Sequence, residues 1–263
     1  MKIRSSAVWM AVTAGMFFLT AADGQQVVEP AISPAKQALA QASAQRRYAH
    51  IVFYRADDDA TRAMAQVVTA IAGQHPDSVV PVYVSIADPA EQPLVQQFAV
   101  ARAPMPIVIA VAPNGAITGA FPQRVTAEQL TGAFVTPAMA ACMKSMQQGR
   151  VVFLCVQAGP QPFVPAGVND FLADPQFKDR GDVVFVHAAD PAEAQLLAEL
   201  GMNTTEATQV NTVFFAPPGV IVGKFGLVST KVEIAAALHK AGKCCDDPNC
   251  KHGHAAQPGG TVR

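Results

Sequence analysis

The residues with the clearest chemical potential lie at the C-terminal end of the chain. Cys244, Cys245, Cys250, His252 and His254 bring three thiols and two imidazoles into one short polar segment. Two Cys with two His, or three Cys with one His, satisfy tetrahedral zinc, and two or three thiolates suit Cu(I). The spacing matches no standard zinc finger, and a disulfide from Cys244 or Cys245 to Cys250 is the alternative. We expect this tail to bind zinc or copper.

Soft ligands also gather near the middle of the chain. Met139, Cys142, Met143 and Met146 recur at helical spacing, so one helix face carries all four side chains. Cu(I) binding is one interpretation. A buried stripe shows the same spacing, and we expect these side chains to pack in a core. Cys155 lies in an apolar run and is expected to be a buried strand residue, with a disulfide to Cys142 left open.

Three successive carboxylates, Asp57, Asp58 and Asp59, form the remaining polar cluster. Adjacent carboxylates do not converge on one hard cation unless other ligands join them. We therefore expect these aspartates to cap the start of a helix and to complement its dipole.

The elements that would position these residues occur twice. The pentapeptide Ala-Asp-Pro-Ala-Glu stands at 87–91 and again at 189–193, each time between a strand-like run and a helix-like segment. Matching strands precede each copy, and a hairpin and a closing helix follow it. We expect Thr126 with Gln129 to cap the first closing helix and Ser229 to start the second. The order β-α-β-α-β-β-α is therefore predicted twice.

The N-terminus has the composition of an export signal. Lys2 and Arg4 precede an apolar run over 7–19 that is too short to span a bilayer, and small residues follow it. A secretory signal peptide is predicted, with an uncleaved anchor as the alternative. We expect a periplasmic or secreted protein with no membrane span after cleavage. A net charge of −1 argues against nucleic acid as a partner.

These observations predict five segments along the chain. They are a signal peptide at 1–22, a first domain at 33–135, a linker helix at 136–149, a second domain at 150–242, and a flexible Cys/His-rich tail at 243–263. Two domains of about this size agree with the length of the chain.

The element order, with a hairpin after the second helix, resembles the thioredoxin fold present twice. Pro106, directly before the first hairpin, matches the cis-proline of that family, whereas Val210 stands at the corresponding place of the second copy. The family's Cys-x-x-Cys is missing: the matching segments are 58–61 and 158–161, and neither contains cysteine. The resemblance implies an α/β fold of two tandem thioredoxin-like domains, each a mixed sheet flanked by helices. It also implies no dithiol–disulfide exchange at the family's site.

The resemblance further implies a place where a peptide binds. In thioredoxin-like proteins the residue before the cis-proline, here Met105, offers its backbone to an extended peptide, with Pro106 beside it. A purely structural proline is the alternative. We expect an exported, non-catalytic scaffold or peptide-binding protein whose partner is an exported protein or peptide. A zinc- or copper-handling protein, and a thiol–disulfide oxidoreductase acting through the tail cysteines, are the alternatives.

Overall fold

The computed structural model describes residues 33–159, 161–202 and 212–243. Two successive series of helices and strands fill these ranges. The first is α1 (Pro34–Ala44), β1 (Tyr48–Tyr54), α2 (Asp59–Gln74), β2 (Val79–Ser85), α3 (Gln92–Gln97), β3 (Ile107–Val111), β4 (Ile117–Pro122) and α4 (Ala127–Gly132). The second is α5 (Pro137–Gln147), β5 (Val151–Gln157), α6 (Ala166–Ala173), β6 (Gly181–His187), α7 (Ala194–Glu199), β7 (Thr212–Ala216), β8 (Val220–Phe225) and α8 (Lys231–Lys243).

Each series folds around its own four-stranded mixed sheet, in the order β2-β1-β3-β4 and again β6-β5-β7-β8. In the first sheet β1 is parallel to β2 and antiparallel to β3, and β3 is antiparallel to β4. The second sheet repeats these directions strand for strand. The chain therefore contains two tandem thioredoxin-like domains, as the sequence predicted.

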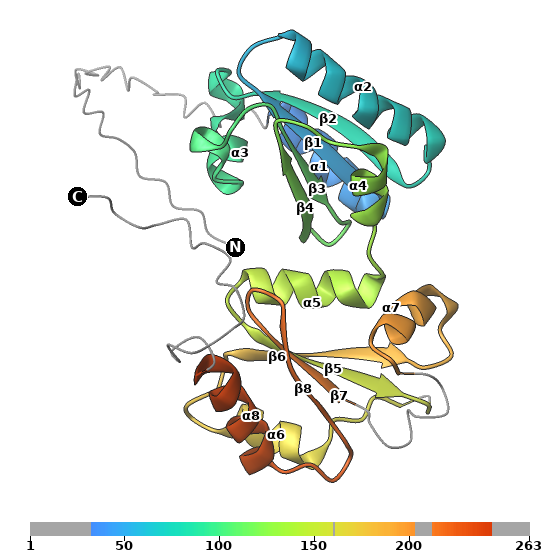
Figure 1. The fold of residues 1–263 in the computed structure, drawn as a ribbon, viewed down its shortest axis with the longest axis vertical. Coiled ribbons are helices and arrows are strands. Elements are labelled where there is room, and N and C mark those ends of the chain that lie inside the picture. The colour runs from blue at the N-terminus through green and yellow to red at the C-terminus, as the bar shows by residue number, and fades with distance from the viewer. Residues whose placement is uncertain (1–32, 160, 203–211, 244–263) are drawn as a thin grey trace, which may run out of the picture. The chain divides into compact units, whose positions relative to one another are not determined.

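Helices cover both faces of each sheet, and the central strands are accordingly buried on both sides (Figure 1). In the first repeat α1 and α3 share one core with the sheet, and α2 and α4 share another. In the second repeat α5 and α7 share one core, and α6 and α8 share the other. The segment 136–149 contains α5, which packs on β5 and β6 as α1 packs on β1 and β2.

The repeated pentapeptide has a structural role that its sequence does not reveal. Asp88 accepts a hydrogen bond from the amide of Ala90 at 2.9 Å and so starts a short 3₁₀ turn at Pro89–Glu91. Glu91 is buried, and its Oε1 accepts the amide N–H of Ala35 in the first turn of α1 at 3.2 Å. The same bond recurs in the second repeat, where the amide N–H of Ala138 in α5 donates to Glu193 at 2.8 Å. The carboxylate satisfies an amide that the helix itself leaves unpaired.

We expect Glu193→Ala to lower the free energy of unfolding by about 1–3 kcal/mol, because the buried amide of Ala138 would lose its acceptor. Glu193→Gln keeps an acceptor oxygen of similar reach and should cost less. Urea denaturation of both variants measures the difference. Equal losses would show that the hydrogen bond to α5 is not what Glu193 contributes.

The apolar face of α5 and the two core cysteines lie as expected. The structure excludes the alternative of a disulfide between Cys142 and Cys155. Cys142 and Met146 are buried in the core beneath α5, and Met139 and Met143 pack against it. Cys142 and Cys155 are both free and buried, and Cys155 contacts Thr212 at 3.7 Å. Leu154 and Val156 share the core of Cys142, so alternation along β5 turns Cys155 to the other face of the sheet.

One helix start is as predicted and one lies a residue later. Thr126 and Gln129 form the expected reciprocal capping box at α4, with bonds of 3.2 and 2.9 Å. Helix α8 is capped by Thr230, which exchanges hydrogen bonds with Glu233 at 2.8 and 3.3 Å. The prediction of Ser229 was therefore wrong, because its hydroxyl instead accepts the amide N–H of Gly226.

Candidate functional site

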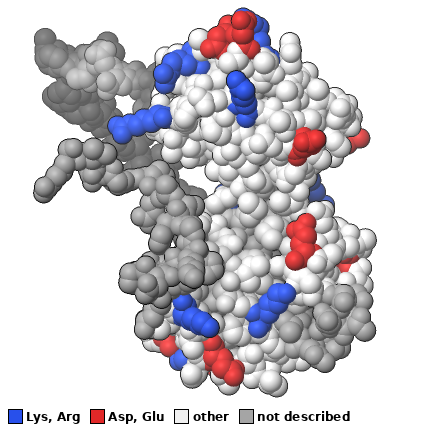
Figure 2. All heavy atoms as spheres, in the orientation of Figure 1, with Lys and Arg blue, Asp and Glu red and all other residues white. Residues whose placement is uncertain are grey.

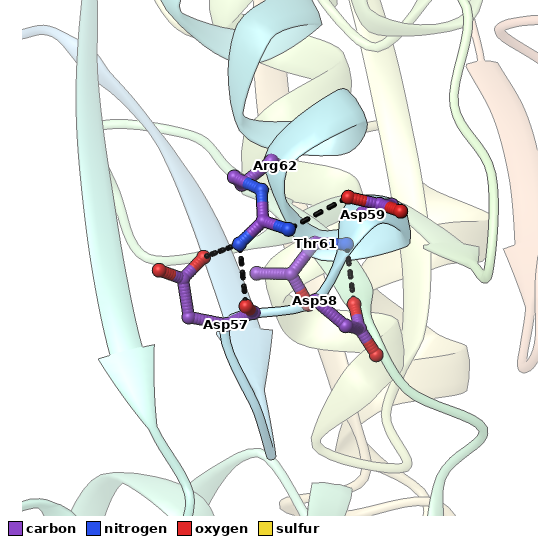
Figure 3. A network of polar contacts seen from close by, with 5 residues as sticks. All are labelled: Asp57, Asp58, Asp59, Thr61 and Arg62. Carbon is purple, nitrogen blue, oxygen red and sulfur yellow. Dashed lines mark hydrogen bonds and ion pairs between the residues drawn. The ribbon is translucent and has the colours of Figure 1, made fainter.

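The turn between β1 and α2 is where the thioredoxin resemblance places the reactive cysteines. Asp58 is the N-cap of α2, and its carboxylate accepts the amide N–H of Thr61 at 2.8 Å (Figure 3). Hydrogen bonds from Thr61 hold the pKa of Asp58 below its usual value. A carboxylate thus occupies the positive end of the helix that would activate a thiol in the family's motif. The predicted capping role is confirmed for Asp58.

A guanidinium connects the other two aspartates of this turn. Arg62 donates to the backbone carbonyl of Asp57 at 2.6 Å and to its carboxylate at 3.3 Å. Its second amino group bonds to Asp59 at 2.6 Å (Figure 3). All three side chains are more than half exposed, so the network adds little to stability. It organises the turn and partly neutralises its negative charge.

The corresponding helix of the second repeat begins later than the sequence suggested. Counting from the end of the strand placed the motif at 158–161, but α6 starts at Ala166 with Pro165 before it. Its N-cap has no side-chain hydrogen bond. The connection from β5 to α6 is longer than the one from β1 to α2, so the helix starts later. Pro165 holds the extended backbone that directly precedes the first turn of α6. That assignment of 158–161 was wrong.

The second predicted feature of the site is the Met105–Pro106 segment, which leads into β3. Its peptide bond is cis, as the resemblance predicted. Pro106 is buried and accepts the amide N–H of Gln123 at 2.7 Å, and Met105 is half-buried against the first core. Over residues 33–159, 161–202 and 212–243, neither the amide nor the carbonyl of Met105 has a hydrogen-bond partner. One backbone donor and one acceptor of this segment are therefore unpaired among the described residues.

A buried histidine was not among the residues singled out from the sequence. His50 lies in β1 with 0% exposure, and its ring stacks on Phe134 at a centroid distance of 5.8 Å. Neither ring nitrogen has a hydrogen-bond partner in the described part of the chain. Burial lowers the pKa of His50 to about 4. Its place directly before the apolar run Ile51–Phe53 was the available signal.

Charged side chains do not mark a site for a polyanion on the face shown in Figure 2. Lysine and arginine are interspersed there with aspartate and glutamate among uncharged residues. Among the described residues, His, Cys, Asp and Glu form no cluster of three or more that could hold a metal ion. None of the helices described in the structure is both long and apolar enough to cross a bilayer.

Several predicted features lie outside the described residues. They are the signal segment 1–22, Val210, and the tail ligands Cys244, Cys245, Cys250, His252 and His254. Export, and the binding of zinc or copper by the tail, stay predictions from the sequence.

No protein-family model and no curated protein sequence matches the chain. Solved structures that are similar to it include human ERp44, which is 8% identical with a TM-score of 0.33, covering 77% of this chain and 55% of that one. The first two thioredoxin domains of Saccharomyces cerevisiae Eps1p are 11% identical with a TM-score of 0.30, covering 78% and 96%. The NTD_N/C domain of the alkylhydroperoxide reductase AhpF from Enterococcus faecalis is 16% identical with a TM-score of 0.28, covering 76% and 96%. The fold assignment rests on the strand order of the two sheets, which is that of tandem thioredoxin-like domains.

Proposed function

We propose that the chain is an exported, non-catalytic binding protein that holds extended polypeptide segments at the Met105–Pro106 edge of its first domain. The observation that carries this proposal is that the backbone of Met105 has no hydrogen-bond partner within the described part of the chain. An extended peptide pairs with such groups by adding a short strand, and its affinity then depends on the main chain more than on side chains.

The chemistry of the described thiols and of the start of α2 supports a non-catalytic role. Cys142 and Cys155 are buried, and burial raises the pKa of Cys142 to about 12 and also raises that of Cys155. Because the thiolate is the nucleophile, both groups are poorly reactive at neutral pH. Asp58 stands at the helix start where a reactive cysteine would stand, and its carboxylate has no sulfur with which to form the mixed disulfide that exchange requires. We therefore expect a chain that lacks the tail cysteines, with residues 243–263 removed, to leave insulin disulfides unreduced.

The binding test uses residues 23–263 and an unfolded, thiol-free probe, reduced and carboxymethylated α-lactalbumin. The protein is labelled with ¹⁵N at methionine, which provides an amide signal at Met105 and others in α5. We expect the Met105 signal to shift on addition of the probe, whereas those of Met139 and Met143 stay in place. Binding without any change at Met105 would place the peptide elsewhere.

A pair of variants separates the backbone donor from the side chain. Met105→Pro removes the amide N–H and should weaken binding about tenfold, the worth of one well-formed hydrogen bond. Met105→Leu keeps the amide and should bind as the unchanged protein does. Circular dichroism establishes that both variants are folded. Equal affinity of two folded variants would contradict the proposal.

A further inference from the structure

Helix α5 covers the β3–β4 hairpin of the first repeat through specific contacts. Lys144 donates to the carbonyl of Gly115 at 3.0 Å. The side-chain amide of Gln147 pairs with both backbone groups of Ile117, accepting its N–H at 3.0 Å and donating to its carbonyl at 2.6 Å. Ala140 of the same helix packs with Ala116 in one apolar cluster. The helix thus satisfies part of an edge strand that would otherwise be open.

The matching hairpin of the second repeat has the same register. Ile117 pairs with Val111 in the first sheet, and Ile221 pairs with Phe215 at the same place in the second. Ala116 is 0% exposed, whereas Val220, its counterpart, is 50% exposed and Ile221 is 49% exposed. Strand β8 is again the edge of its sheet. Two large apolar side chains therefore meet solvent where the first repeat places a helix.

The counterpart of the covering helix is α1. Ala35 and Ala138 are equivalent because each donates its amide to the glutamate of a repeated pentapeptide. Counted from them, Ala40, Gln41 and Ala44 stand where α5 has Met143, Lys144 and Gln147, of which Met143 packs against the same apolar cluster as Ala116. All three of these α1 side chains are exposed. Helix α1 thus presents to solvent the face that α5 turns to a hairpin.

We propose that α1 of one copy of this chain packs on the β7–β8 hairpin of another copy, in the manner in which α5 packs on the β3–β4 hairpin. The alanines of α1 would cover Val220 and Ile221, and the side-chain amide of Gln41 would donate to the turn carbonyl at Gly219. Helix α1 and the β7–β8 hairpin are different surfaces, so the contact is head-to-tail. An open assembly therefore has a free α1 at one end and a free hairpin at the other. A contact made by one helix is small, so the association is weak and depends on concentration.

The test is sedimentation of residues 23–263 over a range of concentrations. The unchanged protein should form dimers and larger species as its concentration rises. Ile221→Lys buries a charge in the contact and should weaken association by about tenfold or more. Val232→Lys, at a 73% exposed position of α8 outside the contact, is the matched control and should behave as the unchanged protein. A chain that stays monomeric at every concentration would overturn the proposal.

A mixing experiment identifies the two surfaces. Ala44→Lys should block α1 and leave the hairpin intact, whereas Ile221→Lys does the reverse. Each variant alone should be monomeric. An equimolar mixture should form dimers that grow no further, because Ala44→Lys keeps an intact hairpin and Ile221→Lys keeps an intact α1. Circular dichroism checks that both variants fold. A mixture that stays monomeric would exclude the head-to-tail contact and point to a different occupant of the hairpin.

Discussion

Lowering the pH from 7 to 4 should destabilise the first domain by about 3 kcal/mol through His50 alone. Burial depresses the pKa of this imidazole to about 4 in the folded state, whereas an unfolded histidine titrates near ~6.5. Between these values the unfolded chain binds more protons than the folded one, so stability falls as the pH falls. The loss sets in as the pH falls through the unfolded pKa and levels off only below the folded pKa.

The surroundings of His50 offer the imidazolium no compensation. Pro81 and Ala110 flank it on the neighbouring strands, and Phe134 lies against its ring. The titratable groups that meet the same Phe134 ring are Tyr48 and His75, neither of which is an anion in this pH range. A proton on His50 would therefore be buried without an acceptor among the described residues.

Tyrosine fluorescence provides a measurement confined to the first domain, because Tyr48, Tyr54 and Tyr83 all lie there and residues 23–263 contain no tryptophan. Urea unfolding is followed at pH 7, 6, 5 and 4. His50→Phe should remove most of the pH dependence, and His239→Gln, at an exposed position of α8, should leave it unchanged. If His50→Phe lost as much stability between pH 7 and pH 4 as the unchanged protein, the pH dependence would belong to other groups.

The elements that could be predicted from the sequence are those set by local patterns. Both hairpins and the strand directions follow from apolar runs and turn residues, and the repeat fixes their order. The start of α8 was also within reach: Thr230 and Glu233 have the spacing of a capping box, and Ser229 has no acidic partner at that distance. The start of α6 could not be predicted, because the length of the loop before it leaves no periodic signal in the sequence.

Long-range relations could not be predicted in the same way. Nothing near Glu91 in the sequence indicates that its partner is Ala35, and the bond forms because the fold brings a turn to the start of α1. The burial of His50 was not predicted. Strand β1 is a central strand buried on both faces, so it lacks the alternation of polar and apolar residues that would mark a solvent-facing side. For the candidate site, the resemblance to the thioredoxin fold indicated Met105 and Pro106, but only the structure shows that the Met105 backbone has no partner among the described residues.

Replacing Gly167 by alanine should destabilise the second domain strongly, although alanine is the better helix former. Gly167 lies in the first turn of α6, where α6 meets the chain that leads into α8. A Cβ at this position would stand 2.0 Å from the carbonyl oxygen of Ser229 and 3.0 Å from the carbonyl carbon of Thr230. Both are backbone atoms at the capped start of α8, so no side-chain rotation relieves the contact.

The sign of the effect is what distinguishes packing from helix propensity. Gly→Ala within a helix ordinarily stabilises by about 0.5–1 kcal/mol, and Gly73→Ala in α2 should do so because a Cβ there meets nothing within 4 Å. Gly167→Ala should instead cost about 1–3 kcal/mol or more, since α6 and α8 must separate to admit the methyl group. Calorimetry reports both domains, and tyrosine fluorescence should show the first domain unchanged in Gly167→Ala. If Gly167→Ala raised the melting temperature as expected for Gly73→Ala, it would contradict the close contact of Gly167 with the start of α8.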